Sequence, residues 1–442
     1  MPLTGIQIYK LLPQTNCKEC GFPTCLAFAM KLSAKQVELA ACPYVTDASK
    51  AQLAESAAPP IRLISLKAAG GEVKVGNEVV MFRHEKTFYN KPGLFLRVRD
   101  DDPDLHSKVT AAQAFKVAYV GMDLTLDGFA VQATGDGAKF TAAIKTVREV
   151  SKRPIILISQ DTAVAGAGLQ ALSGEAVLLH GANASNWEGM AALAKSHSAA
   201  LTVVAPTLDT LAELTEKIKS KGVEDMVLQP EASSLGGSLA LGTQIRRLAL
   251  KKNFRALGYP TIVLAGDGDN ARENIVAAQA IAKYGGFVVI DHFSPAAVYP
   301  LLVLRQNIYT DPQKPIQVQP GIYEINSPKP ESPVLVTTNF SITYFSVANE
   351  VEGSGLPAWL VVTDAEGMSV LTAWAAGKFD AERIAKAIKG FNVAEKVSRK
   401  RMVIPGHVAV LSGELEGELP DWEIRVGPRE AVDLPAFMKQ AL

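Results

Sequence analysis

Cysteine is scarce in this sequence and is confined to one short segment. The four cysteines all lie between positions 17 and 42, and the rest of the 442-residue chain has none. A disulfide framework would distribute its cysteines along the chain, and cytosolic thiols stay reduced. Four cysteines gathered in one segment therefore indicate a metal or cluster site.

The sequence also lacks an excess of charge of either sign. Its 45 basic residues balance 45 acidic ones, so no overall field attracts nucleic acid or an anionic membrane. Residues 1–16 contain neither the apolar run nor the cleavage site of a signal peptide. No apolar stretch reaches the roughly 18 residues that span a bilayer. We expect a cytoplasmic protein without nucleic-acid or membrane partners.

The length predicts more than one domain, since single hydrophobic cores stop growing near ~250–300 residues. Two segments read as linkers, Ala54–Pro60 and the proline-rich Asn326–Pro333, and the second is expected to be a stiff spacer. We predict an N-terminal cysteine domain over residues 1–58, a central domain over 59–325 and a C-terminal domain over 326–442.

Between the linkers, short β-branched runs alternate with amphipathic helical patterns such as Leu208–Lys221 and Ala271–Tyr284. The candidate strands are Leu94–Arg97, Val117–Val120, Ile155–Ile158, Val177–Leu179, Leu201–Val204, Met226–Leu228, Thr261–Leu264 and Phe287–Ile290. Continuous apolar runs are typical of parallel strands covered on both faces. The α/β alternation predicts a TIM (β/α)₈ barrel, with residues 61–92 capping its bottom.

The C-terminal domain repeats this alternation on a smaller scale. Candidate strands are Val334–Thr337, Trp359–Thr363, Val408–Leu411 and Trp422–Val426, and candidate helices are Asn339–Val351 and Ala381–Lys389. This pattern predicts an open, Rossmann-like α/β sheet, whose ligands bind beyond the carboxyl ends of the strands.

The cysteines have the spacing Cys17-x₂-Cys20-x₄-Cys25-x₁₆-Cys42 and are followed by Pro43. The x₂ pair can hold one metal corner from a tight turn, and a helix over Leu26–Ala41 would carry the last cysteine back. A cysteine–proline ending also closes ferredoxin-type loops. The spacing favours a 4Fe–4S cluster over a Cys₄ zinc site, which usually has two x₂ pairs, and over free thiols.

Polar residues are expected at the carboxyl ends of barrel strands, where barrel enzymes place catalysis. They are Asp123, Asp127, Gln160, Asp161, His180, Asn183, Gln229, Asp267, Asp269, Asp291 and His292. No metal trio or nucleophile is evident among them, and such residues also cap helices and satisfy turns. We interpret the barrel as a scaffold without catalytic residues.

Three glycine-bearing segments of the C-terminal domain, 363–377, 404–413 and 426–431, indicate a ligand site. Glycine permits close approach of the backbone to a ligand, and neighbouring hydroxyls can hydrogen-bond to it. Neither a Walker motif nor Gly-x-Gly-x-x-Gly is present, so the residues leave the ligand type open.

Taken together, the cysteine module, the barrel and a small α/β domain with Thr363-Asp-x-Glu-Gly367 and Ile404-Pro-Gly-His407 resemble one known family. This family is the large (gamma) subunits of corrinoid/iron–sulfur proteins of the anaerobic acetyl-CoA (Wood–Ljungdahl) pathway of carbon dioxide fixation. The resemblance covers the whole chain, and the cysteine module is its most specific part.

The resemblance implies two cofactors and their ligands. Cys17, Cys20, Cys25 and Cys42 match the ligands of a 4Fe–4S cluster, and the C-terminal domain would hold a cobamide. The residues that would contact the cobamide are Asn339, Thr343, Gly367, Leu371, Thr372, Gly377, Gly406, Ser412, Gly413, Arg429 and Ala431. Thr372 is expected beneath the cobalt.

The resemblance also implies a methyl carrier of a methyltransferase system rather than a complete enzyme. Cobalt(I) would accept a methyl group from methyltetrahydrofolate on a partner methyltransferase and deliver it to acetyl-CoA synthase/CO dehydrogenase. The cluster, supplied by a low-potential electron donor, would reduce accidentally formed cobalt(II). A smaller corrinoid protein subunit would complete a heterodimer.

None of the six histidines lies in an Asp-x-His-x-x-Gly cobalt-ligand motif. Asp104-Leu-His106 begins that pattern, but Val109 stands where glycine is required. A base-off corrinoid without a histidine ligand is therefore expected. A pterin-binding barrel methyltransferase with an electron-transfer cluster, a zinc-bearing barrel enzyme and a ferredoxin-fused electron carrier are the alternatives.

Overall fold

The computed structural model describes residues 4–441, except 34–35, 51–52, 54–58, 86–87, 89, 120–121, 233, 267–268 and 311–315. Two compact units emerge from its contacts. We call Met1–Phe115 with Thr125–Tyr309 the barrel unit, and Lys116–Leu124 with Thr310–Leu442 the C-terminal unit. No helix among the described residues has the length and apolar character needed to cross a membrane.

The cysteine segment folds as a small helical module. Its elements are α1 (Gly5–Leu11), α2 (Cys25–Ser33) and the 3₁₀ helix η1 (Leu39–Ala41). Thr4 starts α1 with a capping box: its hydroxyl accepts a hydrogen bond from the Gln7 amide, and the Gln7 side chain accepts one from the Thr4 amide. Ile8, Phe28 and Val45 form a core with two of the cysteines.

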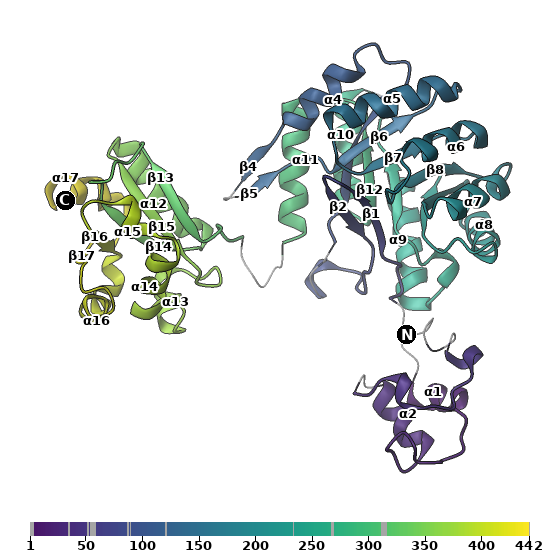
Figure 1. Cartoon of the computed structure of the whole chain (residues 1–442), viewed down its shortest axis with the longest axis horizontal. Coiled ribbons are helices and arrows are strands. Elements are labelled where there is room, and N and C mark those ends of the chain that lie inside the picture. Colours follow the sequence, from purple (N-terminus) through teal and green to yellow (C-terminus); the bar gives the residue numbers. More distant parts are fainter. Residues whose placement is uncertain are drawn as a thin grey trace. The chain divides into compact units, whose positions relative to one another are not determined.

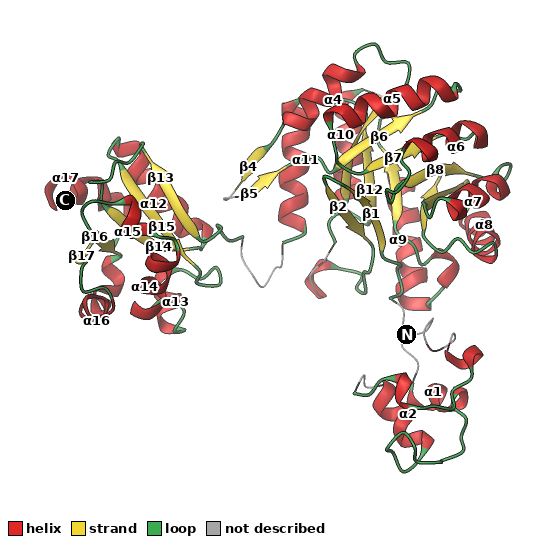
Figure 2. Cartoon of the chain, viewed as in Figure 1, coloured by secondary structure: helices red, strands yellow, loops and turns green. Residues whose placement is uncertain are grey.

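The predicted TIM barrel is confirmed. Eight parallel strands close in the order β3-β6-β7-β8-β9-β10-β11-β12, and helices surround them (Figures 1 and 2). The strands are β3 (Gly93–Arg99), β6 (Gly128–Gln132), β7 (Ile155–Ile158), β8 (Leu178–Ala182), β9 (Ala200–Ala205), β10 (Met226–Pro230), β11 (Thr261–Leu264) and β12 (Gly285–Ile290). The side chains of β7 are entirely buried, as its continuous apolar sequence requires.

The barrel helices are α4 (Leu105–Ala114), α5 (Gly137–Val150), α6 (Thr162–Ala171), α7 (Trp187–Ser196), α8 (Leu208–Ser220), α9 (Leu235–Lys252), α10 (Asn270–Ala282) and α11 (Pro295–Ile308), with 3₁₀ helices η2 (Arg83–Glu85) and η3 (Arg255–Leu257). All of these α-helices except α4 and α7 begin with a side chain that accepts a hydrogen bond from a first-turn amide. Asp136, Asp161 and Asp269 each accept hydrogen bonds from first-turn amides of α5, α6 and α10.

A hairpin of β1 (Ile64–Ala68) and β2 (Gly71–Val75) closes the amino-terminal end of the barrel. Ile64 and Leu66 share one core with lumen residues contributed by all eight strands. The amide of Gly70 donates to the carbonyl of Lys152, just before β7. The expected cap over residues 61–92 therefore exists in this hairpin, whereas Val79–Phe82 forms no strand.

One predicted barrel strand is wrong. Val117–Tyr119 (β4) pairs antiparallel with Met122–Leu124 (β5) in a separate hairpin, and β6 occupies the barrel position instead. In β4, Val117 is buried but Ala118 is exposed, whereas the first four residues of β6 are all buried. The hairpin belongs to the C-terminal unit, where Tyr119 packs on the core.

The C-terminal unit contains the predicted open α/β sheet, with strand order β13-β15-β14-β16-β17. Its strands are β13 (Gly321–Ile325), β14 (Val334–Thr338), β15 (Ala358–Thr363), β16 (Arg401–Ile404) and β17 (Glu423–Val426). Its helices are α12 (Ser341–Ser354), α13 (Val370–Ala375), α14 (Ala381–Gly390), α15 (Val393–Lys396), α16 (Ser412–Glu418) and α17 (Leu434–Ala441), with 3₁₀ helices η4 (Gly406–Leu411) and η5 (Ala431–Asp433). All pairs are parallel except β13 with β15.

Two cores cover opposite faces of this sheet. Val334, Val336 and Val361 belong to one core, and Leu335, Leu360 and Val362 belong to the other, as strand alternation requires. Helices α13, α14 and α16 contribute to the first core, and α12 and α17 contribute to the second. The predicted strand Val408–Leu411 is wrong because this segment is the 3₁₀ helix η4, preceded by Pro405.

The second linker differs from expectation, and most of the first is not described. Residues 54–58 of the first linker lie outside the described residues. Asn326–Pro333 connects β13 and β14 within the sheet, and the side-chain Nδ2 of Asn326 donates to the carbonyls of Val351 and Leu356 at 3.0 and 2.9 Å. β13 therefore belongs to the C-terminal sheet rather than to the barrel. Division of the chain into 1–58, 59–325 and 326–442 stays a prediction.

Candidate cofactor sites

The cysteine module places its four thiols in different environments. Cys25 starts α2 and Cys42 follows η1, and each is 6% exposed within the module's core. Cys20 packs partly buried against the same core, while Cys17 is exposed. The amide of Cys25 donates to Asn16 Oδ1 at 2.8 Å, which joins the first and third cysteine-bearing turns.

The local backbone confirms the tight turn predicted for the x₂ pair. The Gly21 amide donates to the carbonyl of Lys18 at 2.9 Å, and both residues have positive φ angles, +80° and +67°. The continuous helix predicted over Leu26–Ala41 is wrong, because α2 ends at Ser33 and η1 precedes Cys42. Among the described residues of this stretch, Gln36 and Val37 form a bend and Leu39–Ala41 forms the 3₁₀ turn before the last cysteine.

The donor set of this module fits an iron–sulfur cluster. All four thiols are free, and an apolar core with Phe22 and Phe28 surrounds the buried ones, which suits sulfur ligation in a shielded site. In the described part of the chain, no three Cys, His, Asp or Glu side chains are gathered closely enough to hold a metal ion. The module therefore fits an iron–sulfur cluster by the number and type of its possible ligands, which are four cysteine thiols.

A second site lies where β14 and β16 separate. The two parallel strands pair only through Val334 with Met402 and Leu335 with Val403, whereas β14 pairs with β15 along its whole length. The chain passes from β14 to β15 on one side and then returns to β16 on the other. Such a topological switch point is where open α/β sheets bind ligands.

A cavity of about 570 Å³ occupies this position, and we call it the switch-point cavity. Its lining residues are Leu335, Val336, Thr337, Ile342, Thr343, Ser346, Val347, Asn349, Glu350, Ser369, Val370, Leu371, Val403, Ile404, Pro405, His407, Gly427, Pro428, Arg429, Glu430, Ala431, Val432 and Leu434. They come from two strands, from α12, α13 and α17, and from the segments after β16 and β17, which include the 3₁₀ helices η4 and η5. Apolar and hydrogen-bonding groups are thus mixed around one concave site.

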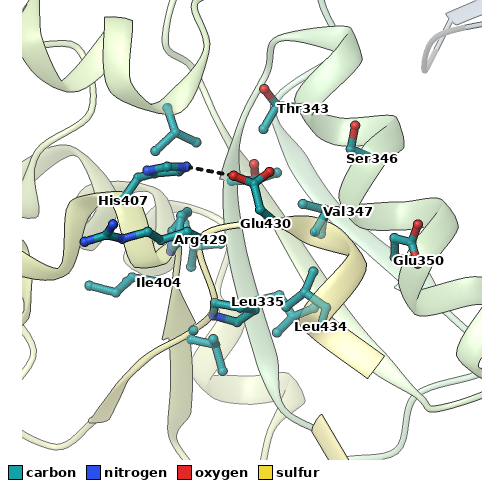
Figure 3. A pocket seen from close by; sticks show the side chains of 18 of the residues that line it. Leu335, Thr343, Ser346, Val347, Glu350, Ile404, His407, Arg429, Glu430 and Leu434 are labelled. Carbon is teal, nitrogen blue, oxygen red and sulfur yellow. Dashed lines mark ion pairs between the residues drawn. The ribbon is translucent and has the colours of Figure 1, made fainter. Parts of the chain in front are cut away.

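Figure 3 shows two polar sides of the cavity. Thr343, Ser346 and Glu350 follow one another along α12, while His407, Arg429 and Glu430 project from the two loops. His407 Nε2 lies 3.8 Å from Glu430 Oε1 and so links the loops after β16 and β17. The cavity can offer hydroxyl, carboxylate and guanidinium groups to one ligand.

Thr337 supplies an independent sign that this cavity takes a polar ligand. The residue is 0% exposed, lines the cavity, and its Oγ1 has no hydrogen-bond partner in the described structure. Buried hydroxyls in folded proteins almost always have a partner. The amide-bearing edge of a corrinoid offers donors and acceptors for such a hydroxyl, so the residues present fit that group.

Four of the predicted corrinoid contacts line the cavity: Thr343, Leu371, Arg429 and Ala431. Gly406 lies behind the lining, since a Cβ there would meet the carbonyl of Gly427 at 2.5 Å. Close approach of the loops after β16 and β17 therefore requires glycine at this position.

Asn339 and Gly367 organise a loop instead of lining the cavity. Asn339 is buried, and its Oδ1 accepts hydrogen bonds from the amides of Ala365 and Gly367 at 2.9 and 3.0 Å. Its Nδ2 donates to Asp364 Oδ1 at 3.2 Å. Asn339 thereby shapes the loop that leads to α13, which carries lining residues.

The remaining predicted contacts lie outside the lining. Thr372 is exposed on α13, with its hydroxyl 3.0 Å from that of Ser369, and Gly377 follows this helix with a φ of +65°. Ser412 donates to the carbonyl of Ala409 at 2.9 Å, and Gly413 lies beside it in α16. These positions as cobamide contacts stay predictions.

The predicted contacts include none of five polar lining residues, Thr337, Ser346, Glu350, His407 and Glu430, although His407 and Glu430 lie within two of the predicted glycine-bearing segments. Ser346 and Glu350 lie three and seven residues after the predicted contact Thr343, so helical periodicity alone could have indicated them. Nothing in the sequence indicates that the hydroxyl of Thr337 lacks a partner.

The polar residues predicted at the carboxyl ends of barrel strands divide into three groups. Gln160, Asp161, His180, Asn183, Gln229, Asp269, Asp291 and His292 lie in or after the ends of β7, β8, β10, β11 and β12. Asp123 lies in the β4–β5 hairpin, and Asp127 lies before β6, where it pairs with the buried Arg305. Those two predictions are wrong, and Asp267 lies outside the described residues.

Comparisons with known proteins agree over the whole chain. A family model for the CO dehydrogenase/acetyl-CoA synthase delta subunit matches residues 64–438, and one whose description names an Fe-S cluster matches residues 12–44. The chain is 43% identical to the corrinoid/iron-sulfur protein large subunit of Moorella thermoacetica, with 100% of both chains covered. It is 35% identical to the acetyl-CoA decarbonylase/synthase complex subunit gamma of Archaeoglobus fulgidus, covering 98% of this chain and 97% of that one.

Among solved structures, the chain is similar to a dihydropteroate synthase from Thermus thermophilus, with 20% identity and a TM-score of 0.37. The match covers 50% of this chain and 95% of that one.

Proposed function

Because the chain belongs to the family of corrinoid/iron–sulfur protein large subunits and acetyl-CoA decarbonylase/synthase gamma subunits, we propose that it is the methyl-carrying subunit of an acetyl-CoA-forming system. The observation that carries this proposal is the full-length similarity, at 43% identity, to a protein whose name states both cofactors. A cysteine module and a switch-point cavity, each suited to one of those cofactors, support it.

The switch-point cavity is the proposed place of the cobamide. A bound cobamide would supply a nucleophilic cobalt centre that accepts a methyl group and passes it on. Thr337, Thr343 and Arg429 provide hydrogen-bonding groups for its polar edge, and Leu335, Ile404 and Leu434 provide apolar surface. This mixture of apolar walls and a few polar groups is typical of cofactor sites.

The cysteine module is the proposed place of a 4Fe–4S cluster. Such a cluster would supply the electron that restores reduced cobalt after accidental oxidation. Burial of Cys25 and Cys42 would keep water from two of its ligands, while exposed Cys17 would leave one ligand near the surface. The chain thus separates electron supply from methyl carriage into two sites.

The base-off state without a histidine ligand remains part of the proposal. His407 is the one histidine among the described residues that line the cavity. Its Nε2 faces Glu430 at 3.8 Å, and Ile404-Pro-Gly-His407 is not a cobalt-ligand motif of the Asp-x-His-x-x-Gly kind. We assign His407 to the rim of the site, where it links two loops.

The proposed partners are a smaller corrinoid protein subunit in a heterodimer, a methyltetrahydrofolate methyltransferase, acetyl-CoA synthase/CO dehydrogenase, and a low-potential electron donor. The names of several relatives, which are subunits of an acetyl-CoA decarbonylase/synthase complex, support an assembly of this kind. Ile342 and Val432 at the cavity are 64% and 66% exposed, as expected for apolar side chains that a partner protein covers in the assembly. We place this oxygen-sensitive chemistry in the reducing cytoplasm.

A methyl-transfer assay tests the function. The anaerobically purified protein with its small subunit is reduced, then mixed with isotopically labelled methyltetrahydrofolate and the methyltransferase. We expect the label to appear on the protein in an amount matching its cobalt, and to pass to acetyl-CoA when acetyl-CoA synthase, CO and CoA are added. Labelled acetyl-CoA forming at the same rate without this protein would contradict the proposal.

A further inference from the structure

The carboxyl-terminal end of the barrel lumen holds a polar layer that the proposed function does not use. Strand alternation sends every second residue into the lumen, and Phe95, Leu178, Ala200, Val227 and Phe287 belong to the lumen core. Two or four residues further along these strands come Arg97, His180, Thr202, Gln229 and Asp291, which we call the mouth layer. Barrel proteins bind ligands at this end.

Two members of the mouth layer neutralise each other. Arg97 Nε and Nη2 donate to the two carboxylate oxygens of Asp291 at 2.6 and 2.5 Å. The buried Glu273 accepts hydrogen bonds from the amides of Asp291 and His292 at 2.9 and 3.1 Å, which fixes the turn after β12. This ion pair involves Nε and Nη2 of Arg97, so Nη1 remains available as a hydrogen-bond donor.

His180 is held in one tautomer with an open acceptor. Its Nε2 bonds with Gln229 Oε1, so the ring hydrogen lies on Nε2 and Nδ1 carries a lone pair. Nδ1 has no partner in the described structure although the residue is only 6% exposed. Burial, and secondarily the charge of Arg97, lowers the pKa of His180 and keeps the ring neutral.

Thr202 is the second group without a partner in this layer. It pairs directly with His180 in the barrel register, is 0% exposed, and its Oγ1 has no hydrogen bond in the described structure. A register shift follows His180, where Gly181 has a φ of +128°. Such bulges re-aim side chains and are frequent beside ligand sites.

We propose that the mouth layer binds a small neutral ligand carrying an amide, with its N–H directed to His180 Nδ1 and its carbonyl oxygen to the hydroxyl of Thr202 and to the donors of Gln229 and Arg97. A buried acceptor and a buried hydroxyl without hydrogen-bond partners destabilise the folded protein, and a ligand that forms hydrogen bonds with both removes this cost. A carboxylate does not suit this layer, because it brings no N–H donor and would lie against Asp291. The site is separate from the switch-point cavity and requires no corrinoid.

Nicotinamide and nicotinate test the assignment, because they differ only in an amide against a carboxylate. Their binding to the full-length protein at neutral pH is measured by calorimetric titration. We expect nicotinamide to bind one equivalent saturably and about tenfold or more tighter than nicotinate. Absence of saturable nicotinamide binding, or equal or tighter nicotinate binding, overturns the proposal.

Two threonine variants separate a ligand role from a structural one. Thr202→Val removes the hydroxyl without a partner, so the melting temperature should hold or rise while nicotinamide affinity falls about tenfold. Thr215→Val is the matched control, since that buried hydroxyl donates to the carbonyls of Ala212 and Ala256 at 2.8 and 2.7 Å. It should lose stability and keep the affinity. Unchanged nicotinamide affinity in Thr202→Val contradicts the site.

A spectroscopic measurement completes the test without a variant. In protein labelled with ¹⁵N-histidine, the Nδ1 signal of His180 should shift as nicotinamide is added, because the lone pair then accepts a hydrogen bond. The signals of His106, which is exposed in the first turn of α4 and is not part of the mouth layer, should stay in place. An unchanged His180 signal at saturating nicotinamide contradicts the proposed contact.

Discussion

Leu335 of β14 and Val403 of β16 form the last register pair between these two strands, and beyond it the strands part. Thr337 and Ile404, which follow that pair, line a cavity instead of facing each other across a ladder. The cavity therefore results from the course of the backbone at a topological switch point. Side chains from α12 and from two loops only complete it.

The hydroxyl of Thr337 gives the first prediction. Thr337→Val should leave the free energy of unfolding unchanged or raised, because the lost hydroxyl has no partner, while cobamide affinity falls about tenfold. Chemical unfolding and equilibrium dialysis with cobinamide measure the two effects. Thr338→Val is the matched control: its hydroxyl is also buried and unpartnered in the described structure but does not line the cavity. Equal losses of affinity in both variants would remove Thr337 from the site.

The cysteine module should be separable from cobamide binding. Cys20→Ala is expected to abolish the iron–sulfur absorbance, because each thiolate of a four-cysteine set is a ligand, and to leave the cobalt content unchanged. Methyl transfer should persist when cobalt is reduced chemically. Loss of cobalt together with iron in folded protein would show that the two sites depend on each other.

The lower face of the cobalt is tested by two histidine variants. Thr372 is the residue predicted beneath the metal, although its side chain is exposed on α13, next to the lining residue Leu371. Thr372→His should then introduce nitrogen hyperfine splitting into the electron paramagnetic resonance spectrum of cobalt(II). An unchanged spectrum in cobamide-loaded protein would move Thr372 away from that face.

His407→Ala is the companion variant, because His407 already lines the cavity. The wild-type cobalt(II) spectrum should lack imidazole splitting, and His407→Ala should leave it unchanged. Splitting that is present in the wild type and disappears in His407→Ala would contradict the base-off, histidine-free state.

His180 predicts a pH dependence of barrel stability. Burial lowers its pKa in the folded protein below the value of 6.5 expected when unfolded, so the unfolded state binds the extra proton. The contribution of neutral His180 to the free energy of unfolding is fully present above pH 6.5 and is lost as the pH falls towards the folded pKa. In this range the free energy of unfolding falls by at most about 1.4 kcal/mol per pH unit. His180→Gln should flatten the unfolding free energy between pH 6.5 and lower pH relative to wild type. An identical pH profile in both proteins would refute this assignment.

The fold was largely predictable because its signals are local. Runs such as Ile155–Ile158 are apolar at every position and predict a strand buried on both faces. Gly128–Gln132 was missed because Val117–Val120, earlier in the chain, has the stronger β-branched pattern, yet it folds as a hairpin. Tertiary pairing decided between these two segments, and strand propensity is too dependent on context to do so.

The candidate site was predictable only in part. Cysteine spacing located the cluster module, and glycine-bearing turns located the loops around the cavity. Thr337 was missed because its significance depends on two strands parting, which no pattern along one strand records. The family resemblance predicted Asn339 as a ligand contact, but its side-chain oxygen instead accepts hydrogen bonds from the backbone amides of Ala365 and Gly367 in the next loop.

Metal content of the anaerobically purified protein decides whether the chain carries both an iron–sulfur cluster and a corrinoid. We expect about four iron atoms and one cobalt atom per chain, with iron held by the cysteine module and cobalt by a cobamide in the C-terminal unit. Cys20→Ala should lower the iron content and leave cobalt at one per chain. Iron without cobalt would indicate an electron carrier, and one zinc atom with neither iron nor cobalt would exclude both proposed cofactors.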